Sequence, residues 1–337
     1  MVNKPTKTLA ARASTGSTCS MDIVESSRSP NSATPRPLGR DDAANALQAL
    51  YSAPFAISRP AVQSLPFVFA SPHSGRLYPP GFVAHSRLNA LALRRSEDAF
   101  VDELFACVTG LGAPLIAARF PRAYLDVNRA AEELDPAMFA GALTRPADPA
   151  SHRVVSGLGV IPRIVRDGAE IYRDRLEPAE AVRRLDGLYH PYHTALQGLI
   201  AETRARFGYA VLIDCHSMPS AAAVPDMIVG DRYGVSAAPQ LTLAAERALE
   251  MRAFTVGRNT PYAGGYTTHR YGRRAGAVQA LQIEINRGLY LDEERVARGP
   301  RFADVAARLA DAIAALTAAD LRQLMPLPAP PTDLAAE

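Results

Sequence analysis

Short apolar runs alternate with longer amphipathic stretches along most of the chain. The apolar runs predict buried strands at 66–71, 114–118, 124–127, 210–214, 226–229 and 279–285. The amphipathic stretches predict helices at 97–110, 178–206, 237–252 and 301–323. Strands that alternate with helices favour an α/β fold, and we expect a single domain with a mixed central β-sheet flanked by helices.

The two ends of the chain lack this pattern. Residues 1–45 are rich in Ser, Thr, Pro, Arg and Ala and carry few periodic apolar positions, which predicts a disordered extension, although a short helix could begin near Asp41. Residues 326–337 form a proline-rich tail that cannot hold a helix. The folded domain is therefore expected to be residues 46–325.

Two of the predicted strands lead directly into a histidine. The run Phe67–Ala70 is followed by Ser71-Pro-His-Ser-Gly75, and the run at 209–214 is followed by Cys215 and His216. In open α/β sheets, ligands and catalytic groups gather at the carboxyl ends of the strands. Two histidines and a carboxylate, with a fourth position for water, are a common catalytic zinc site. The pattern therefore predicts a metal-dependent hydrolase, whereas either histidine alone would more often be structural.

Glu97 and Asp98 are the candidates for the carboxylate ligand. They follow Ser96, which could cap a helix that begins there. Acidic residues in a first helical turn also stabilise the helix dipole, and that role alone would explain one of the two. The residues themselves leave the choice between the two acids open.

Glu284 is the candidate general base. In the strand at 279–285, Ile283 and Ile285 share one face and Glu284 lies on the other. An acid on an interior strand is costly unless it is paired or functional. Glu284 could accept a proton from the attacking water of a metal-assisted hydrolysis. The alternative is a buried ion pair with Arg287 or another arginine.

A polar face at 122–129 indicates a second part of the site. As a strand, this segment would place Tyr124, Asp126 and Asn128 on one face, which makes a poor apolar core. Asn128 and Arg129 could instead bind a substrate carboxylate, which arginine recognises with paired hydrogen bonds. The alternative is a turn with a solvated face.

His269 is a further candidate for contact with substrate. It lies in a glycine-bounded segment, 264–272, that could close over a bound molecule, although an exposed hairpin fits the pattern equally well. His190 and His193 share a helical face, but they lie in the middle of a predicted helix, so packing or hydrogen bonding is the preferred interpretation.

Composition narrows the class of protein. A formal net charge of +3 over 337 residues, without a run of Lys or Arg, argues against nucleic-acid binding. Three cysteines without a CxxC pair argue against a disulfide framework or a zinc ribbon. No apolar run is long enough to span a membrane, and the first residues lack the apolar stretch of a secretory signal. We therefore expect a cytoplasmic enzyme, with organelle import as the alternative, and predict no oligomeric state.

Taken in order, the motifs of the chain resemble those of the N-formylglutamate amidohydrolase family. The matching segments are Ser71-Pro-His-Ser-Gly75, Ser96-Glu-Asp98, Arg122-Ala-Tyr-Leu-Asp-Val-Asn-Arg129, Gly157-Leu-Gly-Val-Ile-Pro-Arg163, Pro191-Tyr-His193, Asp214-Cys-His-Ser-Met-Pro219, Pro225-Asp226, Gly264-Gly-Tyr-Thr-Thr-His269 and Gln282-Ile-Glu284. Their order is more specific than any one segment. The family is similar in architecture to zinc carboxypeptidases and aspartoacylases, so the resemblance implies a single zinc-hydrolase domain with a mixed sheet.

The resemblance also implies roles for individual residues. It makes His73, Asp98 and His216 the ligands of one Zn²⁺ ion, or of another divalent transition metal, and Glu284 the catalytic acid. Glu97 stands where the family has threonine, which leaves it as the alternative ligand.

Substrate-binding roles follow from the same resemblance. Asn128 and Arg129 match the pair that binds substrate carboxylate in the wider zinc-peptidase group. Arg122, Arg287 and His269 are the further candidates for contact with an anionic substrate.

The reaction implied by the resemblance is hydrolysis of N-formyl-L-glutamate to formate and L-glutamate, by zinc-activated water with Glu284 as general base. The alternatives are deacylation of another N-acyl amino acid, and a non-catalytic relative that binds a metal or an amino acid. A serine hydrolase is disfavoured because the chain has no GxSxG motif. The expected partner is a small anionic N-acyl amino acid, with no nucleic acid and no membrane.

Overall fold

The computed structural model describes residues 40–165, 168–221 and 223–319, which all belong to one compact unit. Most of the expected disordered extension and the whole proline-rich tail lie outside these residues. The folded domain was expected to begin at residue 46, which lies inside helix α1 (Arg40–Ser52). In this helix Ala43, Leu47 and Leu50 share one face, and Leu50 is buried, so the folded part begins before residue 46.

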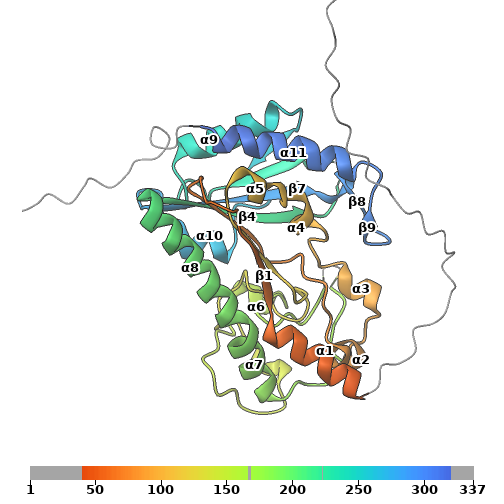
Figure 1. Ribbon diagram of the computed structural model, residues 1–337. Coiled ribbons are helices and arrows are strands. Elements are labelled where there is room, and N and C mark those ends of the chain that lie inside the picture. The colour runs from red at the N-terminus through yellow and green to blue at the C-terminus, as the bar shows by residue number, and fades with distance from the viewer. Residues whose placement is uncertain (1–39, 166–167, 222, 320–337) are drawn as a thin grey trace, which may run out of the picture. The chain divides into compact units, whose positions relative to one another are not determined.

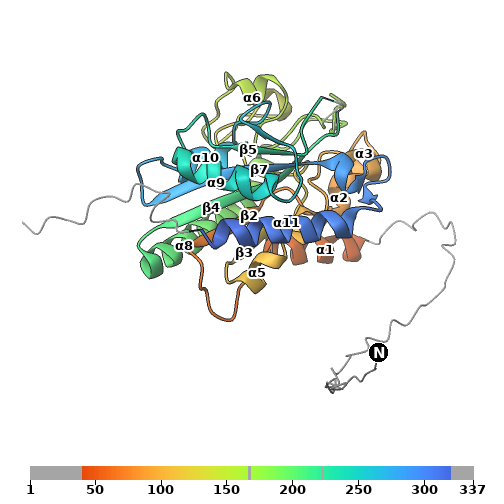
Figure 2. The same ribbon diagram turned by 90° about the horizontal axis from the view of Figure 1, so that it is seen from above.

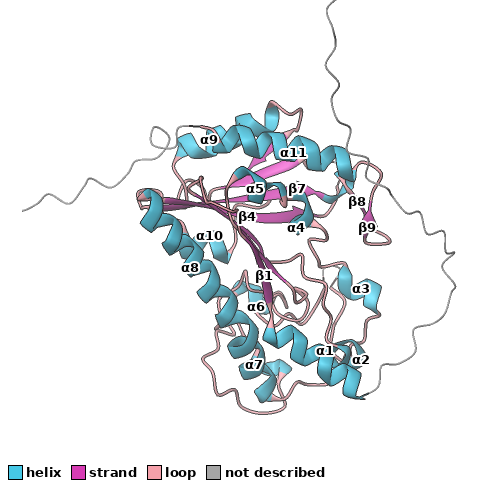
Figure 3. Ribbon diagram, in the orientation of Figure 1, coloured by secondary structure: helices cyan, strands magenta, loops and turns pink. Residues whose placement is uncertain are grey.

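A mixed sheet of seven strands forms the centre of this unit (Figures 1 and 3). In chain order the strands are β1 (Phe55–Ser58), β2 (Phe67–Ser71), β3 (Leu115–Ala118), β4 (Ala210–Met218), β5 (Met227–Gly230), β6 (Val256–Arg258) and β7 (Val278–Asn286). Across the sheet their order is β1-β3-β2-β4-β7-β5-β6. Strands β3, β2, β4 and β7 run parallel, whereas β1 is antiparallel to β3 and β5 is antiparallel to β7. The expected α/β fold with a mixed central sheet is confirmed.

Helices cover both faces of the sheet (Figure 2). One face carries α4 (Val101–Leu104), α5 (Cys107–Leu111), α9 (Pro239–Glu250) and α11 (Phe302–Thr317). The other carries α1, α7 (Pro178–Arg184), α8 (His190–Phe207) and α10 (Tyr266–Tyr271). The connections contain α2 (Pro80–His85), α3 (Ala90–Arg94), α6 (His152–Val155), the strand pair β8 (Leu291–Asp292) and β9 (Ala297–Arg298), and the single turns Pro136–Met138 and Arg287–Leu289. No helix in the described part of the chain is long and apolar enough to cross a membrane.

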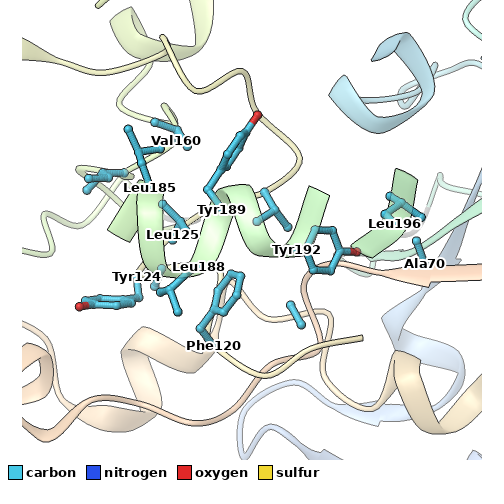
Figure 4. Close-up of a cluster of buried hydrophobic side chains, with 14 of the residues drawn as sticks. Ala70, Phe120, Tyr124, Leu125, Val160, Leu185, Leu188, Tyr189, Tyr192 and Leu196 are labelled. Carbon is cyan, nitrogen blue, oxygen red and sulfur yellow. The ribbon is translucent and has the colours of Figure 1, made fainter. Parts of the chain in front are cut away.

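Two apolar cores result from the alternation of side chains along the central strands. Phe67 and Phe69 of β2 point into the core beneath α9 and α11. Val68 and Ala70 point into the core beneath α8, part of which is shown in Figure 4. Because both faces of these strands are buried, the sequence presents them as continuous apolar runs, which is why they could be predicted.

Two predicted elements near the site are wrong. Residues 124–127 form turns rather than a strand, because the N–H groups of Tyr124 and Asp126 bond to the carbonyls of Pro121 and Val160 and not to a neighbouring strand. The single helix expected at 97–110 is split into α4 and α5, and Phe100 before α4 has a left-handed backbone with φ 63°.

Other differences are smaller. The helix predicted at 178–206 runs from α7 to α8 through a π turn (Leu185–Tyr189). The segment 264–272 contains α10 rather than a loop or hairpin. Strands β1 and β6 were not predicted, because they are short and only partly buried.

The carboxyl ends of three strands meet at one edge of the sheet. In the parallel register, Ala70 of β2 pairs with Asp214 of β4, and His216 of β4 pairs with Glu284 of β7. His73 lies two residues beyond the end of β2. This register brings the strand-end histidines and the strand acid close together.

Candidate metal centre and active site

His73, Asp98 and His216 form a cluster where β2 and β4 end. Their possible ligand atoms all lie within 4.8 Å of one another. Asp98 Oδ2 is 2.9 Å from Nδ1 of His216 and 3.3 Å from Nδ1 of His73. All three side chains are buried. The structure therefore brings together the residues that the sequence offers as ligands, in a cluster that could hold a metal ion.

Backbone contacts place Asp98 in the cluster. Its N–H donates to the carbonyl of His73 at 3.0 Å, which ties the segment before α4 to the turn after β2. The helix cap expected at Ser96 is wrong, because its hydroxyl donates to the carbonyl of Leu93 and α4 begins only at Val101. Asp98 is thus held by a tertiary contact and not by a first helical turn.

The outer nitrogen of each histidine faces a carboxylate. His73 Nε2 is 2.7 Å from Asp126 Oδ1, and His216 Nε2 is 2.9 Å from Asp214 Oδ2. Asn128 Nδ2 donates to the same Asp214 oxygen at 3.4 Å. Carboxylates in this position fix the tautomer and orientation of histidines that bind a metal. They leave Nδ1 of both rings as the atom that faces Asp98.

The donor set fits a divalent transition metal. His73 Nδ1 is buried and has no hydrogen-bond partner within the described residues, which is an uncommon state for an interior polar atom. Two imidazole nitrogens and one carboxylate oxygen, with a further position open, are the donors of catalytic zinc sites. A cation bound among His73, Asp98 and His216 would satisfy the unpartnered nitrogen.

Electrostatics keep the carboxylate of the cluster ionised. Burial alone would raise the pKa of Asp98, but the hydrogen bond with His216 and the nearby His73 hold this pKa well below its usual range. Arg287 Nη2 and Ser217 Oγ donate to the other Asp98 oxygen at 2.9 and 3.2 Å. An ionised carboxylate held in this way is a ready metal ligand.

The pKa of His216 is shifted upward, whereas that of Asp98 is shifted downward. Burial opposes the charge of His216, but the carboxylates of Asp214 and Asp98 outweigh burial and raise the pKa of this ring well above its ordinary value. Protons therefore compete with a metal for this ring.

Glu97 points away from the cluster. It accepts hydrogen bonds from Tyr78 at 2.7 Å and from Arg94 at 3.1 Å. The geometry therefore favours Asp98 over Glu97 as the third ligand.

Glu284 lies beside the cluster as a buried acid. Gln282 Nε2 donates to its Oε1 at 2.8 Å. Burial is the main cause that raises the pKa of Glu284 to about 7; the charge of His216 opposes this shift and that of Asp98 adds to it. The alternative ion pair with Arg287 is not formed, since that guanidinium bonds to Asp98, Ser217 and a backbone carbonyl. A carboxyl group with a pKa near neutrality can both accept and return a proton.

A cavity of about 370 Å³ opens over the cluster and Glu284. This volume lies in the range of small-molecule sites, about 300–1,000 Å³. The wall contains five arginines: Arg95, Arg122, Arg129, Arg153 and Arg287. The site is therefore suited to a small anion.

The residues predicted to bind substrate differ in how many of their polar atoms are already bonded within the protein. Arg122 lines the cavity and uses its Nε to bind Asp126 Oδ2 at 3.0 Å. Arg129 and Asn128 also line the cavity, but Arg129 donates to two backbone carbonyls, and the side chain of Asn128 bonds to Asp214 and to the N–H of Thr267.

The remaining histidines lie outside the cavity. His269 is exposed on α10 and does not line the cavity. His193 is buried and bonds to the carbonyl of Val127 and the hydroxyl of Tyr271, which confirms the hydrogen-bonding interpretation. His190 is exposed.

Several residues of the site received no role from the sequence, among them Asp126, Asp214, Ser217, Gln282 and Arg153. For Asp214 a signal was present, because it shares a strand face with His216, two residues on. Gln282 shares a face with Glu284 in the same way. For Asp126 and Ser217 the sequence carried no comparable signal, since their partners come from other elements.

Comparison with known proteins agrees with this architecture and identifies a family. The model of the family described as N-formylglutamate amidohydrolase matches residues 65–291. Two curated relatives, both named N-formylglutamate deformylase, come from Pseudomonas aeruginosa and Pseudomonas putida. The first is 28% identical over 239 residues, which cover 68% of this chain and 84% of the relative. The second is 29% identical over 241 residues, which cover 68% and 83%.

Solved structures agree. The crystal structure of an N-formylglutamate amidohydrolase from Ralstonia eutropha JMP134 is 36% identical, with a TM-score of 0.71, and the match covers 78% of this chain and 96% of that one. A gene product of Agrobacterium tumefaciens, 19% identical with a TM-score of 0.54, shares the fold over 80% of this chain and 98% of its own. The chain described here is therefore a hydrolase that belongs to the N-formylglutamate amidohydrolase family.

Proposed function

We propose that this protein hydrolyses the formyl amide of N-formyl-L-glutamate to formate and L-glutamate with the help of one divalent cation, Zn²⁺ in the first instance. The observation that carries the proposal is the buried cluster of His73, Asp98 and His216 next to Glu284, in a cavity of about 370 Å³ lined by arginines. The names of the relatives supply the substrate, and the positive wall fits its two carboxylates.

The proposed metal ligands are Nδ1 of His73, Nδ1 of His216 and the carboxylate of Asp98. A zinc ion bound there would supply Lewis-acid chemistry, which lowers the pKa of water and polarises a carbonyl oxygen. Asp126 and Asp214 orient the two rings, and Arg287 with Ser217 orients Asp98.

Glu284 is the proposed general base and acid. Its Oε1 accepts a hydrogen bond from Gln282, which leaves Oε2 to take the proton of the attacking water. As the carbon–nitrogen bond breaks, the same carboxyl group returns the proton to the leaving amine. The products are formate and the free amino group of glutamate.

Arg122 is the proposed ligand of the substrate carboxylate next to the reacting amide. Among the residues that the structure describes, only its Nε has a partner, Asp126 at 3.0 Å, so its terminal nitrogens can form paired hydrogen bonds with a carboxylate. Asn128 and Arg129 are proposed to shape the adjoining wall. His269 has no part in this proposal, since it does not line the cavity.

The purified protein is expected to release formate from N-formyl-L-glutamate and to lose nearly all of this activity after treatment with a chelator. Activity should return when one equivalent of zinc is added, because the cluster offers three donors to a single ion. Formate assay and elemental analysis measure both effects. N-acetyl- and N-succinyl-L-glutamate serve as controls for the acyl group. Full activity in metal-free protein would refute the metal site, and turnover of only the controls would refute the choice of acyl group.

The activity is expected to fall in acid as Glu284 becomes protonated. The pKa of Glu284, about 7 against an ordinary 4.5, means that its basic form is lost as the pH falls through neutrality. A cation nearby favours the ionised form and moves the midpoint lower, so we expect kcat/KM of the zinc-loaded enzyme to decline with a midpoint between these two values. A profile of kcat/KM against pH measures this midpoint. An acid limb that persists unchanged in Glu284→Gln would assign it to another group.

A further inference from the structure

Most of the arginines in the cavity wall already have partners inside the protein. The three nitrogens of Arg287 donate to Ser217, to a backbone carbonyl and to Asp98. Arg129 donates to two backbone carbonyls, and its Nη2 lies 3.7 Å from Asp126. These two side chains shape the protein and have little capacity left for a ligand.

Arg153 differs from the other arginines of the wall. It is exposed, and its side chain makes no hydrogen bond or ion pair with any residue that the structure describes. Within the described part of the chain Arg122 is bonded through Nε alone, and Arg95 already has a partner. All the guanidinium nitrogens of Arg153, which lines the cavity, therefore remain available for a ligand.

The backbone around Arg153 is fixed. Ser151 at the start of α6 donates to Glu133 Oε1 at 2.6 Å, and the other oxygen of Glu133 accepts from the N–H of Ala130. The N–H of Leu158 donates to the carbonyl of Arg153 at 2.7 Å, and the carbonyl of Leu158 accepts from Arg129. Arg153 is thus carried on a segment that is bonded to the wall of the cavity.

Charge in this wall favours an anion. Burial is the main cause that lowers the pKa of Arg129 to about 10; the charge of Asp126 opposes this shift, and the charges of Arg122 and Arg153 add to it. A bound carboxylate would relieve this repulsion. Arg122 lies next to the reacting centre, because it binds Asp126 at 3.0 Å and Asp126 in turn lies 2.7 Å from His73.

Arg153 and Arg122 belong to different segments of the wall, since Arg153 lies on α6 and Arg122 in the turns that follow β3. Figure 2 shows α6 at the periphery, apart from β4 and β7, which carry His216 and Glu284. N-formyl-L-glutamate likewise has one carboxylate next to the amide and a second one at the end of its side chain. Arg122 therefore corresponds to the carboxylate beside the amide, and Arg153 to the carboxylate at the end of the side chain.

We propose that Arg153 binds the side-chain carboxylate of the substrate and so selects a dicarboxylic N-formyl amino acid over a neutral one. This inference rests on the proposed deformylase function. Arg122 takes the carboxylate beside the amide, and Arg153 takes the one at the far end. Because Arg153 does not touch the reacting atoms, it contributes to substrate binding and not to the chemical step.

The test compares N-formyl-L-glutamate with N-formyl-L-glutamine, which has the same length and no charge at its far end. Arg153→Ala is expected to lower kcat/KM for the glutamate substrate about tenfold, mainly through KM, as for the loss of a charge-assisted hydrogen bond that is partly open to water. Turnover of the glutamine substrate should change by less than about twofold, and Arg153→Lys should retain part of the preference for glutamate. Arg204→Ala removes an exposed arginine of α8 whose side chain bonds to no residue in the described ranges, and it should leave both substrates unaffected.

The results separate two kinds of failure. If wild-type protein releases formate and Arg153→Ala changes neither substrate, or lowers both equally, the assignment of Arg153 is overturned while the deformylase function stands. If wild-type protein releases no formate from either substrate, the proposed function fails and the inference fails with it. Thermal unfolding checks folding, and Arg153→Ala should match wild type because the side chain has no partner among the residues that the structure describes.

Discussion

Replacing His73 with alanine is expected to abolish metal binding and to lower kcat for deformylation by about a thousandfold. The ring supplies one of three donor atoms within 4.8 Å of one another, and two remaining donors hold a divalent ion poorly. Loss of the ion removes several kcal/mol of charge stabilisation from the transition state, and each 1.36 kcal/mol changes the rate tenfold. Elemental analysis and a formate assay on the same preparation measure both losses.

The variant should still fold. Without His73, Asp126 keeps Arg122 at 3.0 Å and Arg129 at 3.7 Å, so its buried charge remains paired. His190→Ala is the matched control, because that ring is exposed on α8 and lies outside the cluster. The control should keep both metal and activity. If His73→Ala binds zinc stoichiometrically and with unchanged affinity, the ligand assignment is wrong.

The position of these histidines could be predicted from the sequence for a physical reason. Strand β2 is buried on both faces and is a continuous apolar run that ends just before His73. Strand β4 is apolar only as far as Ile213 and continues as a strand to Met218, so His216 lies among its last residues and not after its end, which the sequence placed at 214. Parallel neighbours end at the same edge of the sheet, which makes convergence of His73 and His216 the natural expectation.

The segment 122–129 shows where local pattern fails. Its alternation of apolar and polar residues has the period of a strand, yet the segment is a chain of turns whose buried polar groups have distant partners. Asn128 accepts from the N–H of Thr267, which is 139 residues away, and Asp126 bonds to His73. Such contacts are fixed by the folded topology and leave no periodic trace in the sequence.

The substrate arginines could not be ranked from the sequence either. Each carries the same charge, and only the folded structure shows which guanidinium is already bonded. Arg287 and Arg129 are committed to internal partners, whereas Arg153 received no role from its sequence context and is exposed in the wall of the cavity. A guanidinium can bind substrate only where it is not already bonded within the protein, and the type of residue alone does not show this.

Replacing Glu284 with glutamine is expected to remove nearly all activity while metal binding is retained. Glutamine keeps the shape of the side chain and can still accept the hydrogen bond from Gln282, but it cannot take a proton from water. Loss of a general base typically costs about a hundredfold to ten-thousandfold in kcat. Glu97→Gln is the matched control, since Glu97 is also a buried acid but lies outside the cluster. A Glu284→Gln enzyme with the wild-type rate would exclude Glu284 as the base.

The same substitution should stabilise the metal-free fold in alkaline solution. The pKa of Glu284 is about 7 in the folded protein against an ordinary 4.5, so the folded state binds the proton more tightly. The cost of ionising this buried acid is therefore absent below the ordinary pKa, grows as the pH rises, and is complete above about 7; its upper limit is about 3 kcal/mol. Glutamine has no such cost, and we expect Glu284→Gln to raise the Tm of metal-free protein by several degrees in alkaline buffer and to leave it unchanged in acid. Thermal unfolding across pH measures the difference, and a lower Tm for the variant in alkali would contradict a buried, uncompensated charge at this position. A variant that gains stability and loses turnover is the expected result if Glu284 serves catalysis. Burial of its carboxylate destabilises the folded state, but the same burial raises its pKa to a value suited to proton transfer.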